Sequence, residues 1–252
     1  MKFELISVLS TIERLYDLPR TRERFNKYLY LLQGDTKNEM VLPIASFNPM
    51  GKELATEKLK RLIQLNAEGI AAQELARINS TLEKHPHRTI RVALNLADDV
   101  EGSWSEYYST DYKSKFEIAS LVKRNFCTPI FWTRESVTEE IIVQRVREYV
   151  FRTLFWVHRG PPKSLQDCLE QEIYVQANST DEISLPKNQD FGNTEKFLSE
   201  HADSEDYNVK FNFFYGDEAS KSLEYATYGI LPYEGFEYAK FLAKRKQEPL
   251  SD

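Results

Sequence analysis

Apolar residues recur three or four positions apart along much of the chain, the spacing that buries one face of a helix. This pattern predicts a helix over residues 5–16, which ends before Pro19, and a second helix from Pro19 to Gly34. In the first half of the chain it also predicts a helix from about Lys52 that Gly69 interrupts, and a helix over 71–82. In the second half it predicts a long helix over 136–159, a helix capped by Ser164 and Asp167, and a short helix near 194–201. Two C-terminal helices follow, separated by Gly229 to Gly235.

Four shorter segments have the length or alternation expected of strands. The clearest is 90–96, where apolar and polar side chains alternate, and 207–213 alternates in the same way. The apolar run 40–47 contains Pro43, which favours a strand at a sheet edge, and 126–132 is a further short apolar run. We therefore expect a mixed α/β (α+β), predominantly helical fold, in which a small sheet of about four strands packs against helices.

The helix over 136–159 is unusual because its last turns, residues 151–157, are apolar on nearly every side. A helix with this pattern is typical of the interior of a fold, so we expect one long central helix. The length of 252 residues and the composition fit one globular domain over 1–252. The polar segment 178–193 is the best candidate for a mobile loop or a boundary.

Charge and cysteine content exclude several classes of protein. The net charge is −6, whereas nucleic-acid binding depends on clustered cations, so we expect no nucleic-acid partner. Arg20, Arg22 and Arg24 do lie close together, but such a run is typical of the solvated face of a helix. Cys127 and Cys168 are far apart within apolar sequence, as reduced core cysteines are. No signal peptide or membrane-spanning segment is evident, so we expect a cytoplasmic protein without a membrane partner.

The turn at residues 48–53 is the first candidate site. It joins an expected strand to an expected helix, and it contains Asn48, Pro49, Gly51 and Lys52. Backbone N–H groups at the start of a helix, together with a lysine, can hold a phosphate or a carboxylate. The turn lacks the pattern of a nucleotide-binding P-loop, and its residues are also those of an ordinary tight turn, so both interpretations stay open.

The second candidate site is the acidic and aromatic stretch 98–112, which follows the clearest strand. Asp98 and Asp99 could act as an acid, a base or metal ligands, while Trp104 and Tyr107 could stack on a ligand. The spacing does not match a calcium-binding loop, and a partly buried structural connection explains the same composition.

His158 is the third candidate, because it ends the long helix within an apolar run. The helix terminus favours its cationic form and an apolar environment disfavours it, so the position suits proton transfer, although a purely structural histidine fits as well. Glu172 lies near an apolar stripe and would need a partner if buried, for which we consider His158 or Arg152.

The sequence does not identify a reaction or a cofactor. The four histidines, which include His85 and His87, lack the spacing of a zinc site, so we expect no metal site, and whether the chain is an enzyme stays open. Our leading hypothesis is a pocket for a polar or anionic small molecule, formed by loops 48–52 and 98–112, with Lys52 binding the anionic group.

The alternative hypothesis is an interaction or structural protein. Tyrosines are enriched at protein interfaces, and exposed ones would form a surface for another subunit, including a second copy of this chain. Those we consider are Tyr107, Tyr108, Tyr225, Tyr228 and Tyr233.

Overall fold

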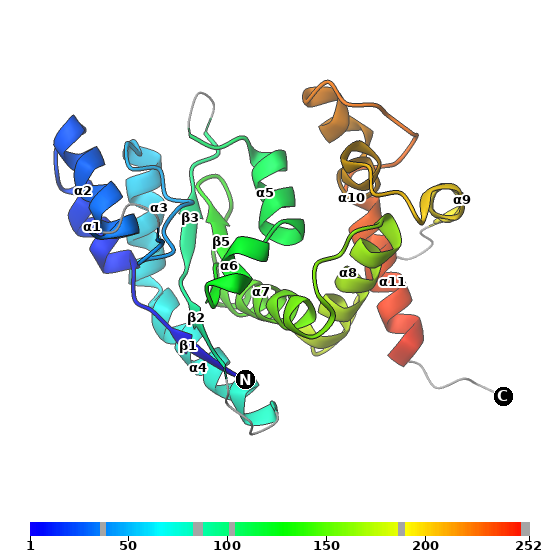
Figure 1. Cartoon of the computed structure of the whole chain (residues 1–252), viewed down its shortest axis with the longest axis horizontal. Helices are drawn as coiled ribbons and strands as arrows, with labels where there is room; N and C mark the ends of the chain where they lie inside the picture. Colours follow the sequence, from blue (N-terminus) through cyan, green and yellow to red (C-terminus); the bar gives the residue numbers. More distant parts are fainter. Residues whose placement is uncertain (36–38, 83–87, 101–103, 186–189, 248–252) are drawn as a thin grey trace. The chain divides into compact units, whose positions relative to one another are not determined.

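A computed structural model describes residues 1–35, 39–82, 88–100, 104–185 and 190–247 (Figure 1). It divides into two compact units, of which unit 1 comprises Met1–Thr110 and Ile118–Val150 and unit 2 comprises Asp111–Glu117 and Phe151–Asp252. The structure is mostly helical with a few short strands, as the sequence predicts. This division does not test the expectation of one domain over 1–252, which stays a prediction.

The strands of the described residues all lie in unit 1. Helices α5 (Tyr107–Phe116) and α7 (Glu139–Arg159) contribute residues to both units. The elements that lie in unit 1 alone are β1 (Lys2–Leu5), α1 (Leu9–Tyr16), α2 (Arg22–Gln33), α3 (Glu53–Gln64), α4 (Ala67–Thr81), β2 (Thr89–Val92), β3 (Asn95–Ala97), α6 (Ala119–Lys123), β4 (Phe126–Cys127) and β5 (Ile130–Trp132). Those of unit 2 alone are α8 (Leu165–Ser179), α9 (Gly192–His201), α10 (Tyr207–Ser222) and α11 (Glu234–Gln247).

The strands form two small parallel sheets rather than one sheet of about four strands. One has the order β1-β2-β4 and the other pairs β3 with β5. Backbone hydrogen bonds continue between them, because the N–H of Ala93 donates to the carbonyl of Cys127 (3.0 Å) and that of Asn95 to Pro129 (2.8 Å). Helices α1 to α4 connect the parallel strands β1 and β2, as a parallel connection requires.

The expected strand over 40–47 is wrong. The N–H of Ile44 donates to Leu42 and the N–H of Phe47 donates to Ile44, so this segment is a series of turns. Ile44 and Phe47 are nevertheless fully buried. The apolar run therefore records a buried loop, whose Pro43 carbonyl accepts a hydrogen bond from the Asn95 side chain (2.8 Å).

The expected strand over 207–213 is also wrong, because these residues begin α10. Asp206 caps this helix by accepting hydrogen bonds from the N–H groups of Asn208 (2.7 Å) and Val209 (3.1 Å). Phe211, Phe213 and Phe214 are all fully buried, although they lie on different sides of the helix. Burial on several sides removes the helical period from the apolar pattern and leaves an apparent alternation.

Helix α1 begins at Leu9 rather than at residue 5, because the chain opens with strand β1. The N–H groups of Val8 (2.6 Å) and Leu9 (3.0 Å) donate to the Glu68 carboxylate from α4, which satisfies the start of α1.

The break after α3 falls at Asn66, whose φ is 53°, and Gly69 lies inside α4. The expected cap of α8 by Ser164 and Asp167 is confirmed.

Candidate anion-binding site

A hollow of about 390 Å³ in unit 1 lies where the connection between α1 and α2 meets the start of α3. Buried Tyr16, Arg24 and Gly51 form its floor. The exposed side chains at its rim carry most of the charge, and they are Arg20, Lys52, Glu53, Glu57 and Lys60. The hollow therefore combines a buried cation with a charged rim.

Arg24 occupies the floor because of its place in the first turn of α2. Side chains at the start of a helix point back toward its N-terminus, and here they meet the end of α1. Nη1 of Arg24 donates to the carbonyls of Tyr16 and Leu18, both at 3.3 Å, and Nη2 donates to that of Gly51 at 3.5 Å. Arg24 thus compensates the partial negative charge at the C-terminus of α1.

The charge of Arg24 has no carboxylate partner among the described residues, since only carbonyls accept its hydrogen bonds. Its side chain is 2% exposed, and its Nε atom has no hydrogen-bond partner. Burial lowers the pKa of Arg24, and the nearby charge of Arg20 acts in the same direction. A buried cation without a counter-charge is costly, and an anion in the hollow would offset that cost.

Tyr16 and Gly51 complete the floor. The Arg24 guanidinium lies 4.4 Å above the Tyr16 ring centroid, and the Tyr16 hydroxyl donates to the Asn48 carbonyl at 2.8 Å. Burial raises the pKa of Tyr16, so this phenol stays protonated as a donor. A Cβ atom at Gly51 would lie 2.9 Å from that hydroxyl, so glycine is required for the close approach of the turn to Tyr16.

The two loops on which the pocket hypothesis rests do meet. The Asn48 side-chain amide donates to Oδ2 of Asp98 at 2.7 Å, and both residues are buried. The Asn48 side-chain oxygen accepts from the N–H of Met50 at 2.9 Å, which fixes the turn before α3. Asp98 therefore holds the Asn48 turn in place, and the described residues of 98–112 do not line the hollow.

The other residues of the second candidate site point to separate environments. Asp99 accepts a hydrogen bond from the N–H of Arg134 at 3.1 Å. Trp104 is 55% exposed, and Tyr107 packs its ring 4.6 Å from that of Trp132. Of the predicted site residues, the structure brings Asn48 and Asp98 into contact and places Lys52 on the hollow.

His158 lies in unit 2, at the end of α7, with its side chain exposed. His85 and His87 lie outside the described residues. Across the ranges that the structure describes, no group of three or more His, Cys, Asp or Glu side chains could hold a metal ion.

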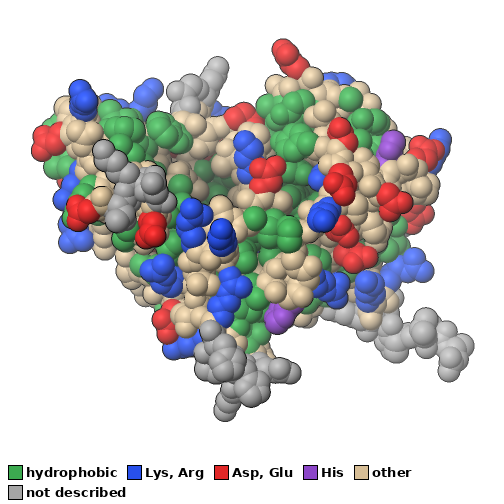
Figure 2. Space-filling view, in the orientation of Figure 1, with side chains coloured by type: hydrophobic (Ala, Val, Ile, Leu, Met, Phe, Trp, Pro, Cys, Tyr) green, Lys and Arg blue, Asp and Glu red, His purple; other side chains and the backbone are tan. Residues whose placement is uncertain are grey.

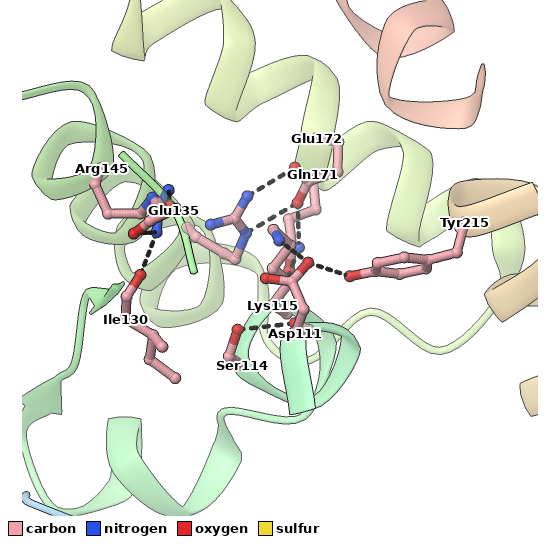
Figure 3. Close-up of polar contacts among 10 residues, drawn as sticks. Asp111, Ser114, Lys115, Ile130, Glu135, Arg145, Gln171, Glu172 and Tyr215 are labelled. Atoms are coloured by element: carbon pink, nitrogen blue, oxygen red, sulfur yellow. Dashed lines mark hydrogen bonds and ion pairs between the residues drawn. The ribbon is translucent and has the colours of Figure 1, made fainter. Parts of the chain in front are cut away.

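Glu172 of unit 2 is fully buried, and its partner is Arg152, which is one of the two pairings considered from the sequence. Figure 3 shows Glu172 beside Gln171, with dashed lines that mark the hydrogen bonds in this cluster. Nε and Nη2 of Arg152 donate to the two carboxylate oxygens at 2.9 and 2.7 Å. The Gln171 amide donates to the same carboxylate at 2.8 Å and accepts from the Trp156 indole at 2.6 Å. Because these groups satisfy one another, we assign the cluster to structure.

A second hollow of about 750 Å³ in unit 1 is more basic at its surface. Arg91, Lys123 and Arg124 contribute to it, and Figure 2 shows Lys and Arg side chains gathered over this α6 region. All three cations are exposed, and none of the described residues that line this hollow is a buried charged one. Solvated charges of this kind favour binding less than the buried cation of the first hollow does.

Sequence reasoning missed two members of the site, Tyr16 and Arg24. The expectation that the arginine run is a solvated helix face holds for Arg20 and Arg22 and is wrong for Arg24. The available signal was position, since Arg24 follows the helix boundary at Pro19 by one turn and can reach the end of the preceding helix.

No protein family, curated protein or solved structure matches this chain. Among the residues that the structure places, no helix is long and apolar enough to cross a membrane. The arguments for function therefore come from the geometry of the hollow.

Proposed function

We propose that this chain binds a polar small molecule through an anionic group held in the hollow between α1, α2 and α3. The observation that carries the proposal is Arg24, a buried cation on the floor of a hollow large enough for a small ligand, which no carboxylate of the described residues pairs with. Lys52 and Arg20 lie at the rim, where their flexible side chains would close on the anionic group.

Asn48 and Asp98 have a positioning role in this proposal. Their hydrogen bond holds the turn that presents Gly51 and Lys52 to the hollow. Catalytic roles for Asp98, Asp99 and His158, and ligand stacking by Trp104 and Tyr107, stay predictions, as does any enzymatic reaction. A cytoplasmic location also stays a proposal, which the burial of Cys127 and Cys168 supports.

The test is ligand-induced thermal stabilisation by a panel of small anions, namely phosphate, sulfate, citrate and acetate. A ligand at one hundred times its Kd stabilises the folded state by about 2.7 kcal/mol. For a domain of this size, that raises Tm by roughly 5–10 °C. We expect such a rise with at least one anion, and a much smaller rise in Lys52→Gln and Arg20→Gln.

The control is Arg61→Gln. Arg61 is an exposed cation on α3 and does not line the hollow, so its removal should leave the rise in Tm unchanged. This control matters because phosphate and sulfate also stabilise proteins without binding a site. Equal stabilisation of all variants, or no stabilisation by any anion, would contradict the proposal.

A second candidate function is an interaction surface on unit 2. Tyr228 (39%), Leu231 (66%) and Tyr233 (36%) are exposed, and Asp217 fixes their segment by accepting from the N–H groups of Tyr228 and Gly229. Rigid exposed aromatics favour protein binding. Tyr107, Tyr108 and Tyr225 are half-buried and support this surface less.

A mass that rises with concentration in the wild type, but not in a Tyr228→Ser/Leu231→Ser variant, would support self-association, and a constant monomer mass would oppose it.

A further inference from the structure

We infer that the exposed tip around Leu231 on unit 2 docks into an apolar groove between α1 and α2 of a second copy of this chain. The tip comprises residues 228–233, and the groove belongs to unit 1. This inference rests on the second candidate function, the interaction surface on unit 2, and it names the partner of that surface.

The tip presents apolar side chains to solvent. Leu231 is 66% exposed, which is the highest value among the large apolar residues that the structure describes. Pro232 beside it is exposed as well, and so is Tyr228. Exposed apolar side chains that gather in one short segment mark an interaction site, whereas single scattered ones need no explanation.

Hydrogen bonds hold the backbone of this tip in place. The N–H of Leu231 donates to Oε2 of Glu234 at 2.9 Å, and its carbonyl accepts from the N–H of Glu234 at 3.2 Å. The preceding carbonyl, that of Ile230, accepts from the N–H of Asp217 at 2.9 Å. A tip that is already ordered loses little conformational entropy when it binds, so a small contact surface can still give measurable affinity.

The groove has the lining that such a tip requires. Helices α1 and α2 lie side by side (Figure 1), and a hollow of about 330 Å³ lies between them. Its apolar members are Leu15, Leu18 and Leu31. An apolar cavity of about 150 Å³ holds a benzene molecule, so this hollow has room for the side chain of Leu231. The two hollows described above have more charged linings and suit an apolar tip less.

The rim of the groove is cationic. Arg14 and Lys27 are its two charged members, and both are exposed. Arg14 donates to the Thr11 hydroxyl at 3.4 Å, and Lys27 lies 5.6 Å from the Tyr30 ring centroid. Neither cation forms an ion pair with a carboxylate of the described residues, so both charges are available to a partner.

The flanks of the tip carry the opposite charge. The segment 217–237 contains one lysine, Lys221, and five carboxylates, which are Asp217, Glu218, Glu224, Glu234 and Glu237. Glu218 and Glu224 are exposed and form no ion pair with a cation of the described residues. An acidic tip and a cationic rim favour encounter in this orientation, whereas two tips in contact would bring like charges together. The charges therefore favour a head-to-tail contact between copies.

The experiment is sedimentation velocity of the full chain from micromolar to millimolar concentration. We expect the wild-type mass to rise with concentration, because a head-to-tail dimer keeps one free tip and one free groove. Leu231→Ser in the tip and Arg14→Glu/Lys27→Glu in the groove should each weaken association at least about tenfold, which is the scale of one buried leucine side chain. Leu54→Ser is the control, because it removes an exposed leucine of α3 that does not line the groove, and it should match the wild type.

An equimolar mixture of the two variants identifies the partner surface. Leu231→Ser keeps the groove and Arg14→Glu/Lys27→Glu keeps the tip, so the mixture should form a dimer although neither variant associates alone. If Leu231→Ser weakens association but the groove variant does not, or if the mixture stays monomeric, the groove is refuted as the partner and the interaction surface on unit 2 stands. A monomeric wild type, or association that Leu231→Ser leaves unchanged, would overturn both.

Discussion

The buried pair of Arg152 and Glu172 gives the prediction with the largest expected effect. Both side chains are 1% exposed, and two hydrogen bonds of 2.9 and 2.7 Å join them. Glu172→Ala would remove the carboxylate that accepts both of these hydrogen bonds from the buried guanidinium, and it would also remove one acceptor of the Gln171 amide. We expect this variant to lose stability well beyond the average substitution.

The magnitude follows from the asymmetry of buried ion pairs. Removing one partner costs about 3–5 kcal/mol, because the other charge stays buried, whereas replacing both by apolar residues is often neutral. The double variant Arg152→Met/Glu172→Leu should therefore recover most of the loss. The exposed pair of Arg159 and Glu170, 3.8 Å apart on the same two helices, supplies the control, and Arg159→Met should cost less than about 1 kcal/mol.

Urea denaturation followed by tryptophan fluorescence measures these differences. Trp156 is a local probe, since its indole donates to Gln171, which in turn contacts Glu172. A loss below about 1 kcal/mol in Glu172→Ala would refute the reasoning, because it would mean that the pair does not stabilise the fold. A double variant as unstable as the single one would refute the argument that the buried charge left at Arg152 causes the loss.

Three further predictions concern backbone and charge. Asn48→Ala removes the donor to Asp98 and should cost about 1–3 kcal/mol in urea denaturation; an unchanged midpoint would mean that the contact between the loops is dispensable. Gly216→Ala should cost at least about 1–3 kcal/mol, because φ is +80° and the added Cβ would lie 2.5 Å from the Leu231 carbonyl, and wild-type stability would contradict this. Burial acts to raise the pKa of Asp217, but hydrogen bonds from an asparagine amide and from loop N–H groups outweigh burial and lower that pKa. The stabilisation by Asp217 is therefore present above about pH 4 and is lost as the pH falls further. Asp217→Asn should flatten this part of the curve of stability against pH.

The sequence predicts best those elements that bury one face. Helix α3 follows its apolar stripe, and strand β2 follows its alternation, whereas Ala93 to Ala97 of the expected strand are all buried. Of the two expected strands that were wrong, 40–47 is a loop with buried Ile44 and Phe47, and 207–213 is a helix buried on several sides. Their apolar patterns report burial without reporting the period of the backbone, so only the tertiary structure separates loop, helix and strand there.

The candidate site was predictable in part. The turn at 48–53 and its contact with residue 98 were expected, although the argument from two strand ends was wrong for the segment before Asn48. The position of Arg24 allows contact with the end of α1, but its burial was missed, because that burial also depends on the Gly51 turn, which lies far along the chain. The packing of α2 against the end of α1 and the Gly51 turn buries Arg24, and the local sequence around Arg24 does not show this packing.

The most direct test of the central claim is a titration of ¹⁵N-labelled protein with inorganic phosphate, followed by amide chemical shifts. We expect saturable changes in the amide shifts of Gly51, Lys52 and Glu53, which line the hollow, and no such changes in Lys52→Gln. Shifts confined to the hollow of Arg91, Lys123 and Arg124, or no saturable shift at the start of α3, would contradict it.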